Sequence, residues 1–356
     1  MIITRTPYRI SFLGGGTDYP GWFRQHGGAV IATTIDKYCY LTCRYLPPFF
    51  EHRYRIVYSR TEDCLSVDEI KHPAVREGLK LLGLTQGIEL HHDGDLPARS
   101  GMGSSSSFAV GLMQALHGLQ NEMVSKEQLA KEAIMLEQKI LKENVGSQDQ
   151  VSAAYGGFNH ITFLNNDEFV VRPIILGRER LAEFHGNFML FFTGISRTAS
   201  DVAASFVPNI DEKKRQLRVL RELVEEGMGL LTSGRDLLGF GELLHEAWMA
   251  KKGLSSLISN SEIDQVYDNA RRAGAIGGKL IGAGGGGFLL LYVPPERQAS
   301  VRHALPSLIH VPFKFEFEGS KTIFYDSEQD YAAIAQDRKR QDIASFREWR
   351  APVSAA

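Results

Sequence analysis

Apolar residues follow two kinds of pattern along this chain. Longer stretches with apolar positions three or four residues apart predict helices over residues 125–144, 211–233 and 262–273. Short apolar or alternating runs predict β-strands over residues 29–35, 38–44, 53–58, 188–192 and 288–293. Because strands and helices interleave without the regular alternation of a doubly wound sheet, we predict the α+β class.

Length and composition narrow the kind of protein. A chain of 356 residues is long enough for two domains, and we expect them at residues 1–180 and 181–356, with a turn-rich junction over residues 165–184. A net charge of -2 provides no broad basic field, which argues against nucleic-acid and membrane-surface partners. No apolar stretch approaches the about 20 residues that cross a bilayer. The three cysteines lack a metal-ligand set, so we expect a reducing, cytoplasmic setting.

The segment from Pro97 to Ser107 is the most distinctive part of the chain, because its glycines and serines lead directly into an apolar helical pattern. A loop with little side-chain bulk lets backbone N–H groups converge on an anion, and the start of a helix adds the positive end of its dipole. The serines can cap N–H groups or offer a hydroxyl to a metal ion. Taken alone, the segment fits both a phosphate-binding loop and a flexible turn.

A glycine cluster near the N-terminus follows an apolar run and precedes a carboxylate. Gly14, Gly15 and Gly16 bring the backbone close to a ligand, and Asp18 can accept hydrogen bonds from hydroxyl groups. A strand-ending turn with a surface carboxylate is the alternative.

A third cluster contains Gly282, Gly284 and Gly287, which formally satisfy the dinucleotide pattern G-x-G-x-x-G. That pattern should follow a strand and open a helix, whereas these glycines precede a strand. We therefore reject the dinucleotide-binding interpretation of these glycines, which disfavours a nicotinamide-dependent oxidoreductase; absence of nicotinamide binding would exclude that class. We expect instead a turn whose bare backbone lies against another segment, such as the loop at residues 101–107.

Two carboxylates have the spacing and context of a reactive site. Glu137 lies within the apolar stripe of the helix predicted over residues 125–144, where an unpaired charge is costly. A metal ion and a buried salt bridge would each supply the missing partner. Asp149 follows close to Gly146. Phosphoryl transfer to a hydroxyl uses one carboxylate to position the acceptor and a separate metal ligand, and these two acids can divide those tasks.

Taken together and in order, these motifs resemble those of the GHMP small-molecule kinases, the family of galactokinase and the homoserine, mevalonate and phosphomevalonate kinases. Residues 97–107 resemble the nucleotide loop P-x-x-x-G-L-G-S-S-A, with Met102 in place of leucine and Ser106 and Ser107 where alanines are usual. Residues 6–19 resemble the first, substrate-side motif, and residues 279–287 the glycine-rich third motif. The resemblance implies an N-terminal ribosomal-protein-like α/β domain and a C-terminal ferredoxin-like α+β domain, with the active site between them.

The resemblance also implies an ATP-dependent kinase with Mg²⁺ as its metal cofactor. Asp149 matches the catalytic carboxylate that orients the acceptor hydroxyl and takes its proton, and Arg9 matches a neighbouring cation that favours the charged carboxylate. Ser105 and Glu137 match the magnesium ligands. The nucleotide phosphates are expected at Gly101, Met102, Gly103, Ser104, Ser105 and Ser106. The expected substrate-side residues are Gly15, Gly16, Asp18 and Gly285. Independently of the resemblance, we add Arg197, because it precedes the helical stretch predicted over residues 198–206, where a guanidinium and a helix start together can bind the distal phosphate of a phosphosugar.

Within the family, residues 9–18, 32–38, 193–197 and 248–252 resemble the sugar 1-kinases that act on D-glycero-D-manno-heptose 7-phosphate. Galactokinases carry Glu-His where this chain has Gly15-Gly16, which argues against galactose. We expect phosphorylation of the anomeric hydroxyl to give the 1,7-bisphosphate, for nucleotide-activated heptose and surface-glycan synthesis. The alternatives are another sugar 1-kinase, such as an L-fucose-type enzyme, and a catalytically silent ATP- and sugar-binding sensor. The expected partner is a small phosphosugar, without nucleic acid or membrane, and we allow for a homodimer.

Overall fold

Two long strands form the centre of the computed structural model, which describes residues 1–98, 100–195, 199–327, 331, 334 and 337. Strand β1 (Ile2–Leu13) pairs antiparallel with β2 (Gly28–Tyr45) along nearly its whole length. The runs predicted at residues 29–35 and 38–44 are one continuous strand. The register shifts between Pro7 and Arg9 of β1. That shift lets a single strand continue past the charged Asp36 and Lys37 and still bury both apolar runs.

Strands from both ends of the chain build the large sheet around this pair. Its main order is β13–β1–β2–β5–β3–β4; β6 and β12 also pair with β2, and β7 pairs with β6. The strands are β3 (Tyr54–Val57), β4 (Thr61–Cys64), β5 (Ile88–Gly94), β6 (Phe158–Phe163), β7 (Phe169–Pro173), β12 (Phe315–Glu316) and β13 (Lys321–Tyr325). The boundary expected after residue 180 falls inside helix α6 (Arg178–Gly186), and β12 and β13 return to the first sheet. The division of the chain at that residue stays a prediction.

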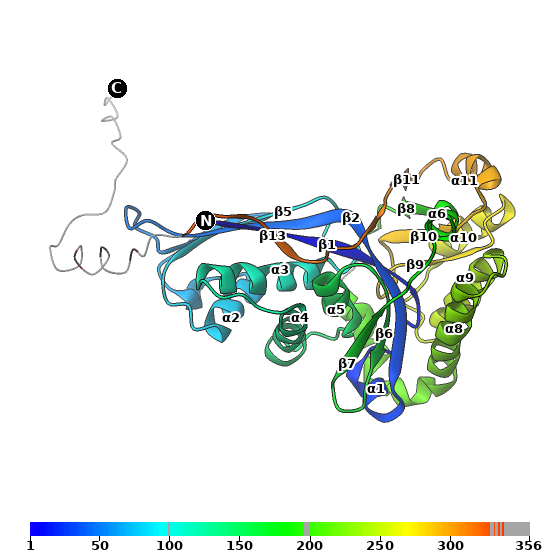
Figure 1. Ribbon diagram of the computed structural model, residues 1–356, viewed down its shortest axis with the longest axis horizontal. Coiled ribbons are helices and arrows are strands. Elements are labelled where there is room, and N and C mark those ends of the chain that lie inside the picture. Colours follow the sequence, from blue (N-terminus) through cyan, green and yellow to red (C-terminus); the bar gives the residue numbers. More distant parts are fainter. Residues whose placement is uncertain (99, 196–198, 328–330, 332–333, 335–336, 338–356) are drawn as a thin grey trace, which may run out of the picture.

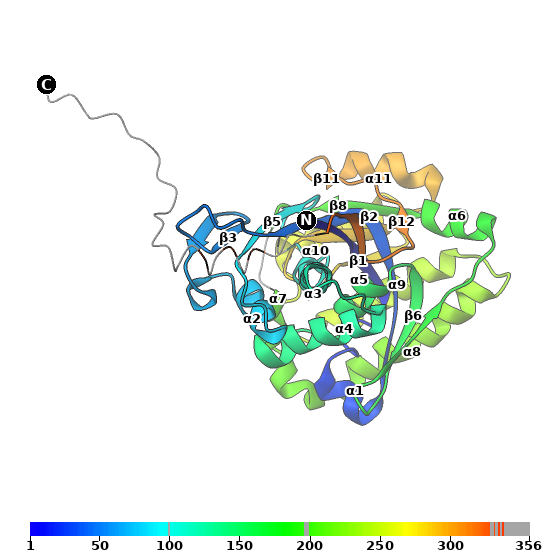
Figure 2. The same ribbon diagram turned by 60° about the vertical axis from the view of Figure 1, so that its left-hand side comes forward.

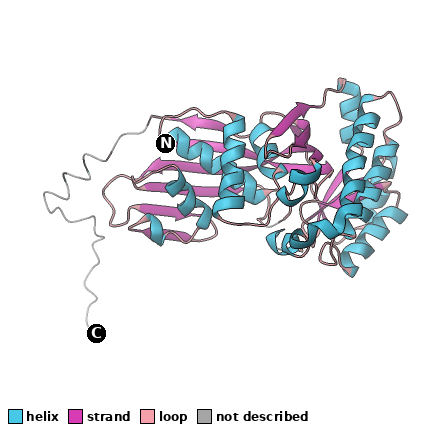
Figure 3. Cartoon of the chain, turned by 90° about the horizontal axis from the view of Figure 1, so that it is seen from below, coloured by secondary structure: helices cyan, strands magenta, loops and turns pink. Residues whose placement is uncertain are grey.

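Helices cover one face of this sheet, as Figures 1 and 3 show. They are α2 (Pro73–Leu81), α3 (Ser104–Leu119), α4 (Lys126–Ile134), the π-helical segment η2 (Met135–Ile140) and α5 (Gln148–Tyr155). Helix α3 packs on β1 and β2 and also contacts α4 and α5, so most of its side chains are buried. The helix predicted over residues 125–144 is α4 followed by η2, and it ends at Ile140 instead of residue 144. A π-helical segment inside a helix often marks a functional site.

A second, four-stranded antiparallel sheet lies toward the other end of the molecule, with the order β11–β8–β10–β9. Its strands are β8 (Phe188–Phe192), β9 (Gly277–Leu280), β10 (Phe288–Tyr292) and β11 (Ile309–His310). The accompanying helices are α8 (Lys214–Thr232), α9 (Leu238–Lys252), α10 (Ser261–Arg272) and α11 (Gln298–Ala304), and Figure 2 shows them turned by 60°. Shorter elements are α1 (Pro20–His26), α7 (Ala199–Ala204), η1 (Val67–Glu69), η3 (Val207–Lys213) and η4 (Pro295–Arg297).

Aromatic side chains join the two sheets into one core. The Phe12 ring of β1 lies 5.0 Å from Phe188 of β8, and the Phe184 ring lies 4.8 Å from Phe240 of α9. An edge-to-face contact such as the Phe184–Phe240 pair adds about 0.5–1.5 kcal/mol beyond the area it buries. The shared core fixes how the loops of the two halves meet. None of the helices in the described part of the chain has the length and apolar character needed to cross a membrane.

Candidate active site

The glycine-serine segment forms a loop that ends at the start of a buried helix. Gly101 and Gly103 both have positive φ, 83° and 76°, and α3 begins at Ser104. The backbone N–H of Arg9 donates to the Met102 carbonyl at 3.1 Å, which connects the loop to β1. The loop therefore presents backbone, rather than bulky side chains, at a helix N-terminus.

The third glycine cluster lies against this loop, which confirms the contact expected from the sequence. A Cβ atom at Gly101 would lie 2.4 Å from the Ile281 carbonyl oxygen, and one at Gly282 would lie 2.4 Å from the Gly101 oxygen. The cluster is the turn of the β9–β10 hairpin, not the entrance to a helix. Gly285 is held elsewhere in that turn, where its N–H donates to the Ile258 carbonyl at 2.8 Å.

Arg9 and Asp149 form a two-pronged ion pair beside the loop. Arg9 Nε donates to Asp149 Oδ1 and Nη2 donates to Oδ2, both at 2.7 Å, while Nη1 donates to the Gly101 carbonyl at 2.7 Å. The Arg9 side chain is 3% exposed and that of Asp149 is 24% exposed. Asp149 lies in the first turn of α5. The pair thus fixes a carboxylate that still has an accessible edge and spare lone pairs.

Glu137 is buried beneath the first turn of α3. Its carboxylate accepts hydrogen bonds from Ser106 Oγ at 2.7 Å, from Ser105 Oγ and from Gln150 Nε2. No cation among the described residues forms an ion pair with it, so the buried salt bridge that the sequence left open is not formed there. Burial raises the pKa of Glu137 from 4.5 to about 7, although the hydrogen bonds from the two serines and the glutamine lower it.

The N-terminal glycine turn places a second buried carboxylate nearby. Asp18 Oδ1 accepts from the Gly16 N–H at 2.9 Å, and Oδ2 accepts from the Gln148 N–H at 3.3 Å. The Ser147 N–H donates to the Asp18 carbonyl at 2.9 Å. Burial raises the pKa of Asp18, and the negative charge of Asp149 raises it further. Asp18 and Asp149 are therefore held close together by the start of α5.

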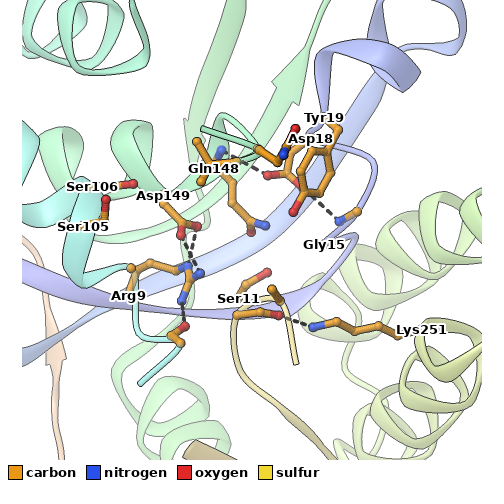
Figure 4. A pocket seen from close by; sticks show the side chains of 18 of the residues that line it. Arg9, Ser11, Gly15, Asp18, Tyr19, Ser105, Ser106, Gln148, Asp149 and Lys251 are labelled. Carbon is orange, nitrogen blue, oxygen red and sulfur yellow. Dashed lines mark hydrogen bonds and ion pairs between the residues drawn. The ribbon is translucent and has the colours of Figure 1, made fainter. Parts of the chain in front are cut away.

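These elements surround a cavity of about 490 Å³. In Figure 4 the Arg9–Asp149 pair lies between the serines of α3 on one side and the glycine turn with Asp18 on the other. The structure brings most of the predicted site residues to this cavity: Arg9, Gly15, Gly16, Asp18, Gly101, Gly103, Ser104, Ser105, Ser106 and Asp149. Met102, Glu137 and Gly285 are not among its lining residues, and Glu137 lies behind Ser105 and Ser106. Arg197 lies outside the described residues.

Two lysines also line the cavity, and our sequence analysis did not place them in the site. Lys251 comes from the end of α9 and Lys279 from β9. Lys251 follows the buried Ala247 and Trp248 at helical spacing, so the sequence pattern already places this cation on the apolar face of a helix. Lys279 stands in a strand whose residues are all buried. In each case a lysine at an apolar position indicated an internal polar site.

The donor set beneath the loop fits a magnesium ion. Mg²⁺ is commonly held by one or two carboxylates together with substrate phosphates, so it does not require a cluster of acidic side chains. No cluster of three His, Cys, Asp or Glu residues able to hold a metal occurs in the described part of the chain. The site beneath the loop instead contains the buried carboxylate of Glu137 and the hydroxyls of Ser105 and Ser106. Among the described residues, this carboxylate has no ion-pair partner. A divalent cation would supply the charge that this carboxylate lacks.

Comparison with known proteins places the chain among kinases. Residues 70–157 match the model of the GHMP kinases N terminal domain, and residues 219–310 match that of the GHMP kinases C terminal domain. A D-glycero-alpha-D-manno-heptose 7-phosphate kinase of Campylobacter jejuni is 28% identical over 85% of this chain and 93% of its own length. A bifunctional fucokinase/GDP-fucose pyrophosphorylase of Arabidopsis thaliana is 26% identical over 84% of this chain and 30% of that longer protein.

A solved structure agrees with this assignment at the level of the fold. The crystal structure of a D-glycero-D-manno-heptose 1-phosphate kinase from Bacteroides thetaiotaomicron superimposes with a TM-score of 0.75, at 24% identity, over 92% of this chain and all of that one. The fold and the site define a small-molecule kinase. The chain belongs to the GHMP kinase family. The family, the two-domain fold of mixed helices and strands, and the enzyme class predicted from the sequence are thereby confirmed.

Proposed function

We propose that this sugar kinase transfers the γ-phosphate of ATP to the anomeric hydroxyl of D-glycero-D-manno-heptose 7-phosphate. The products would be ADP and the 1,7-bisphosphate, a sugar 1-phosphate suited to later activation by a nucleotide. The observation that carries the proposal is the position of the Arg9–Asp149 pair. It lies between the start of α3, which is suited to phosphate groups, and the glycine turn with Asp18, whose buried carboxylate can accept hydrogen bonds from a sugar. A kinase for a hydroxyl acceptor needs these three parts in that order.

The nucleotide side is assigned to the loop and the start of α3. The triphosphate would lie on the backbone of residues 101–106, where N–H groups and the helix dipole favour negative charge. Met102 would contribute backbone only, because its side chain is buried. Glu137 and Ser105 would hold Mg²⁺, which supplies electrostatic stabilisation of the transferring phosphoryl group.

Asp149 is assigned as the general base. Both of its oxygens accept from Arg9, yet each retains a further lone pair, and the side chain has an accessible edge at the cavity. One carboxylate oxygen would accept the proton of the anomeric hydroxyl while the hydroxyl oxygen attacks phosphorus and the bond to ADP breaks. The paired guanidinium fixes the direction of that carboxylate, and such positioning accounts for much of a kinase's rate enhancement.

Asp18, Gly15 and Gly16 are assigned to the sugar. Asp18 is fixed by two backbone N–H groups, so its carboxylate can accept hydrogen bonds from sugar hydroxyls without reorganising. The similarity to the Campylobacter jejuni heptose 7-phosphate kinase over most of both chains supports heptose 7-phosphate as the acceptor. The similarity to the plant fucokinase supports the alternative, an L-fucose-type sugar 1-kinase.

A panel of acceptors tests the proposal. The protein is incubated with Mg²⁺-ATP and, separately, with D-glycero-D-manno-heptose 7-phosphate, free heptose and L-fucose, and the products are followed by phosphorus NMR. We expect a new anomeric phosphate on heptose 7-phosphate, with an equal amount of ADP. Phosphorylation of L-fucose alone would replace the main proposal by the alternative. Binding of ATP and sugar without any ADP release would identify a sensor instead.

A further inference from the structure

Two buried lysines face the cavity on the side opposite the serines of α3. Lys251 is 7% exposed and Lys279 is 3% exposed, yet both line the cavity. In Figure 4 Lys251 reaches toward the cavity from the side that also holds Gly15, while Ser105 and Ser106 lie beyond the Arg9–Asp149 pair. Lys251 therefore lies across the proposed base from the serines of α3, and Lys279 lies beside Gly15 of the substrate-side turn.

Backbone carbonyls are the hydrogen-bond partners that the structure gives these two ammonium groups. Lys279 Nζ donates to the Phe12 carbonyl at 3.0 Å. Lys251 Nζ donates to the Gly282 carbonyl and, at 3.5 Å, to the Leu280 carbonyl. No carboxylate in the described part of the chain forms an ion pair with either. Since an ammonium carries three N–H donors, each lysine has donor capacity left for a ligand.

Burial and nearby positive charges disfavour the charged forms of both lysines. Burial and the neighbouring Arg9 lower the pKa of Lys251 to about 8, against smaller opposing effects of Asp18 and Asp149. Burial, Lys251 and Arg9 lower the pKa of Lys279 well below 10.5. Two like charges held together inside a protein are costly unless an anion joins them.

The surroundings of Gly15 show where that anion would fit. A Cβ atom at Gly15 would lie 3.4 Å from Ser11 Oγ, 3.5 Å from Gln148 Nε2 and 4.0 Å from Lys279 Nζ. The glycine therefore leaves open the space that these three polar groups face. Ser11 Oγ is buried there without a hydrogen-bond partner. A buried hydroxyl without a partner, beside an ammonium, is suited to an oxyanion.

We propose that Lys251 and Lys279 bind a phosphate group on the acceptor, and so select an acceptor that is already phosphorylated before transfer. Ser11 donates a further hydrogen bond to the same group. The inference rests on the proposed function for the identity of the acceptor. It assigns the phosphate preference to the lysine pair on α9 and β9, which the proposed function does not.

The test compares two ligands that differ only in the phosphate. Binding of D-glycero-D-manno-heptose 7-phosphate and of free heptose is measured by calorimetry for the unaltered protein, Lys251→Met and Lys279→Met. A charge-assisted hydrogen bond is worth enough to expect about 10- to 100-fold weaker binding of the phosphorylated sugar in each variant. Binding of the free sugar should change by less than about threefold, because Asp18, which is assigned to the sugar hydroxyls, is unchanged in both variants. An unchanged ratio between the two ligands would refute the inference.

Two further variants separate charge from packing. Lys252→Met removes the next lysine of the same helix, which pairs with Asp264 at 3.1 Å and is not a lining residue, so the ligand ratio should stay as in the unaltered protein. Gly15→Asp places a carboxylate beside Lys279 and leaves both lysines in place. It should weaken binding of the phosphorylated sugar more than Gly15→Asn does, because asparagine has the same size without the charge. Equal effects of the aspartate and the asparagine would point to packing alone and count against the inference.

Inorganic phosphate separates failure of the inference from failure of the proposed function. If the unaltered protein does not phosphorylate heptose 7-phosphate, yet binds phosphate in a way that the Lys251→Met/Lys279→Met double variant abolishes, the anion site stands and the proposed function fails. If the unaltered protein does phosphorylate heptose 7-phosphate and the double variant keeps the same preference for it, the proposed function stands and the anion site fails. Loss confined to ATP binding would place the lysines on the nucleotide instead and overturn the inference.

Discussion

Replacing Glu137 by glutamine should make the metal-free protein more stable at neutral and alkaline pH. Burial raises the pKa of this carboxyl from 4.5 to about 7. The folded protein therefore keeps Glu137 protonated at pH values where the unfolded chain has already lost that proton. The stabilisation that comes from keeping this carboxyl protonated in the folded protein is complete below about pH 4.5, and it is lost as the pH rises toward about 7. The difference between the two pKa values corresponds to as much as about 3 kcal/mol.

The Glu137→Gln side chain can keep the local hydrogen bonds. Its carbonyl oxygen can accept from Ser106 and Gln150, and its amide can donate to the Ser105 hydroxyl. The free energy of unfolding is measured by urea titration in EDTA between pH 5 and 8. We expect the variant to gain on the unaltered protein as the pH rises, by up to about 3 kcal/mol.

The control for this experiment is Glu127→Gln, which changes an exposed glutamate on α4 that pairs with Lys131. Its effect should stay within about 0.5 kcal/mol at every pH. A stability difference between Glu137→Gln and the unaltered protein that does not vary with pH would refute the reasoning. So would a variant that is less stable at pH 8. Adding Mg²⁺ should restore stability to the unaltered protein at pH 8 and have little effect on the Glu137→Gln variant.

Three further substitutions test the geometry of the site. Gly101→Ala places a Cβ atom 2.4 Å from the Ile281 carbonyl oxygen at a residue with positive φ, so the free energy of unfolding should fall by about 1–3 kcal/mol and ATP binding should weaken. A thermal unfolding curve identical to that of the unaltered protein would contradict this. Gly146→Ala places a Cβ atom 1.9 Å from Asp18 Oδ2, so the KM for the sugar should rise about tenfold or more while the Kd of ATP stays unchanged. A rise in both constants would count against the assignment of Asp18 to the sugar. Arg9→Lys keeps the charge and loses the two-pronged geometry, so kcat should fall about 10- to 100-fold in steady-state assays, and a fully active variant would argue against positioning by the guanidinium.

The local pattern of the sequence accounts for much of the site. The apolar stripe predicted that Glu137 is buried, and the reversed context of the glycines at residues 282–287 predicted a turn against the loop at residue 101. The partner of Glu137 could not be predicted this way, since Ser106 lies 31 residues away and the sequence allowed a salt bridge equally well. Only the packing of α3 on η2 decides between those alternatives for the described residues.

Long-range pairing accounts for most of what the sequence did not reveal. Strands β12 and β13 are short and follow the second sheet in the chain, yet they pair with β2 and β1. Nothing in a run of two or five residues specifies so distant a partner. Lys251 and Lys279 were visible as cations at apolar positions. Their meeting at one cavity depends on how α9 packs on β9, which local periodicity does not determine.

The rate of ADP release by an Asp149→Asn variant tests the central claim most directly. Asp167→Asn is the matched control, because Asp167 makes the same two-pronged pair with Arg24, at 2.7 and 3.0 Å, on an exposed turn away from the cavity. With saturating Mg²⁺-ATP and heptose 7-phosphate, the account predicts that Asp149→Asn loses about 10²- to 10⁴-fold in kcat while its Kd for ATP stays within about threefold. Asp167→Asn should keep the unaltered rate. An Asp149→Asn enzyme that turns over as fast as the control would contradict the account.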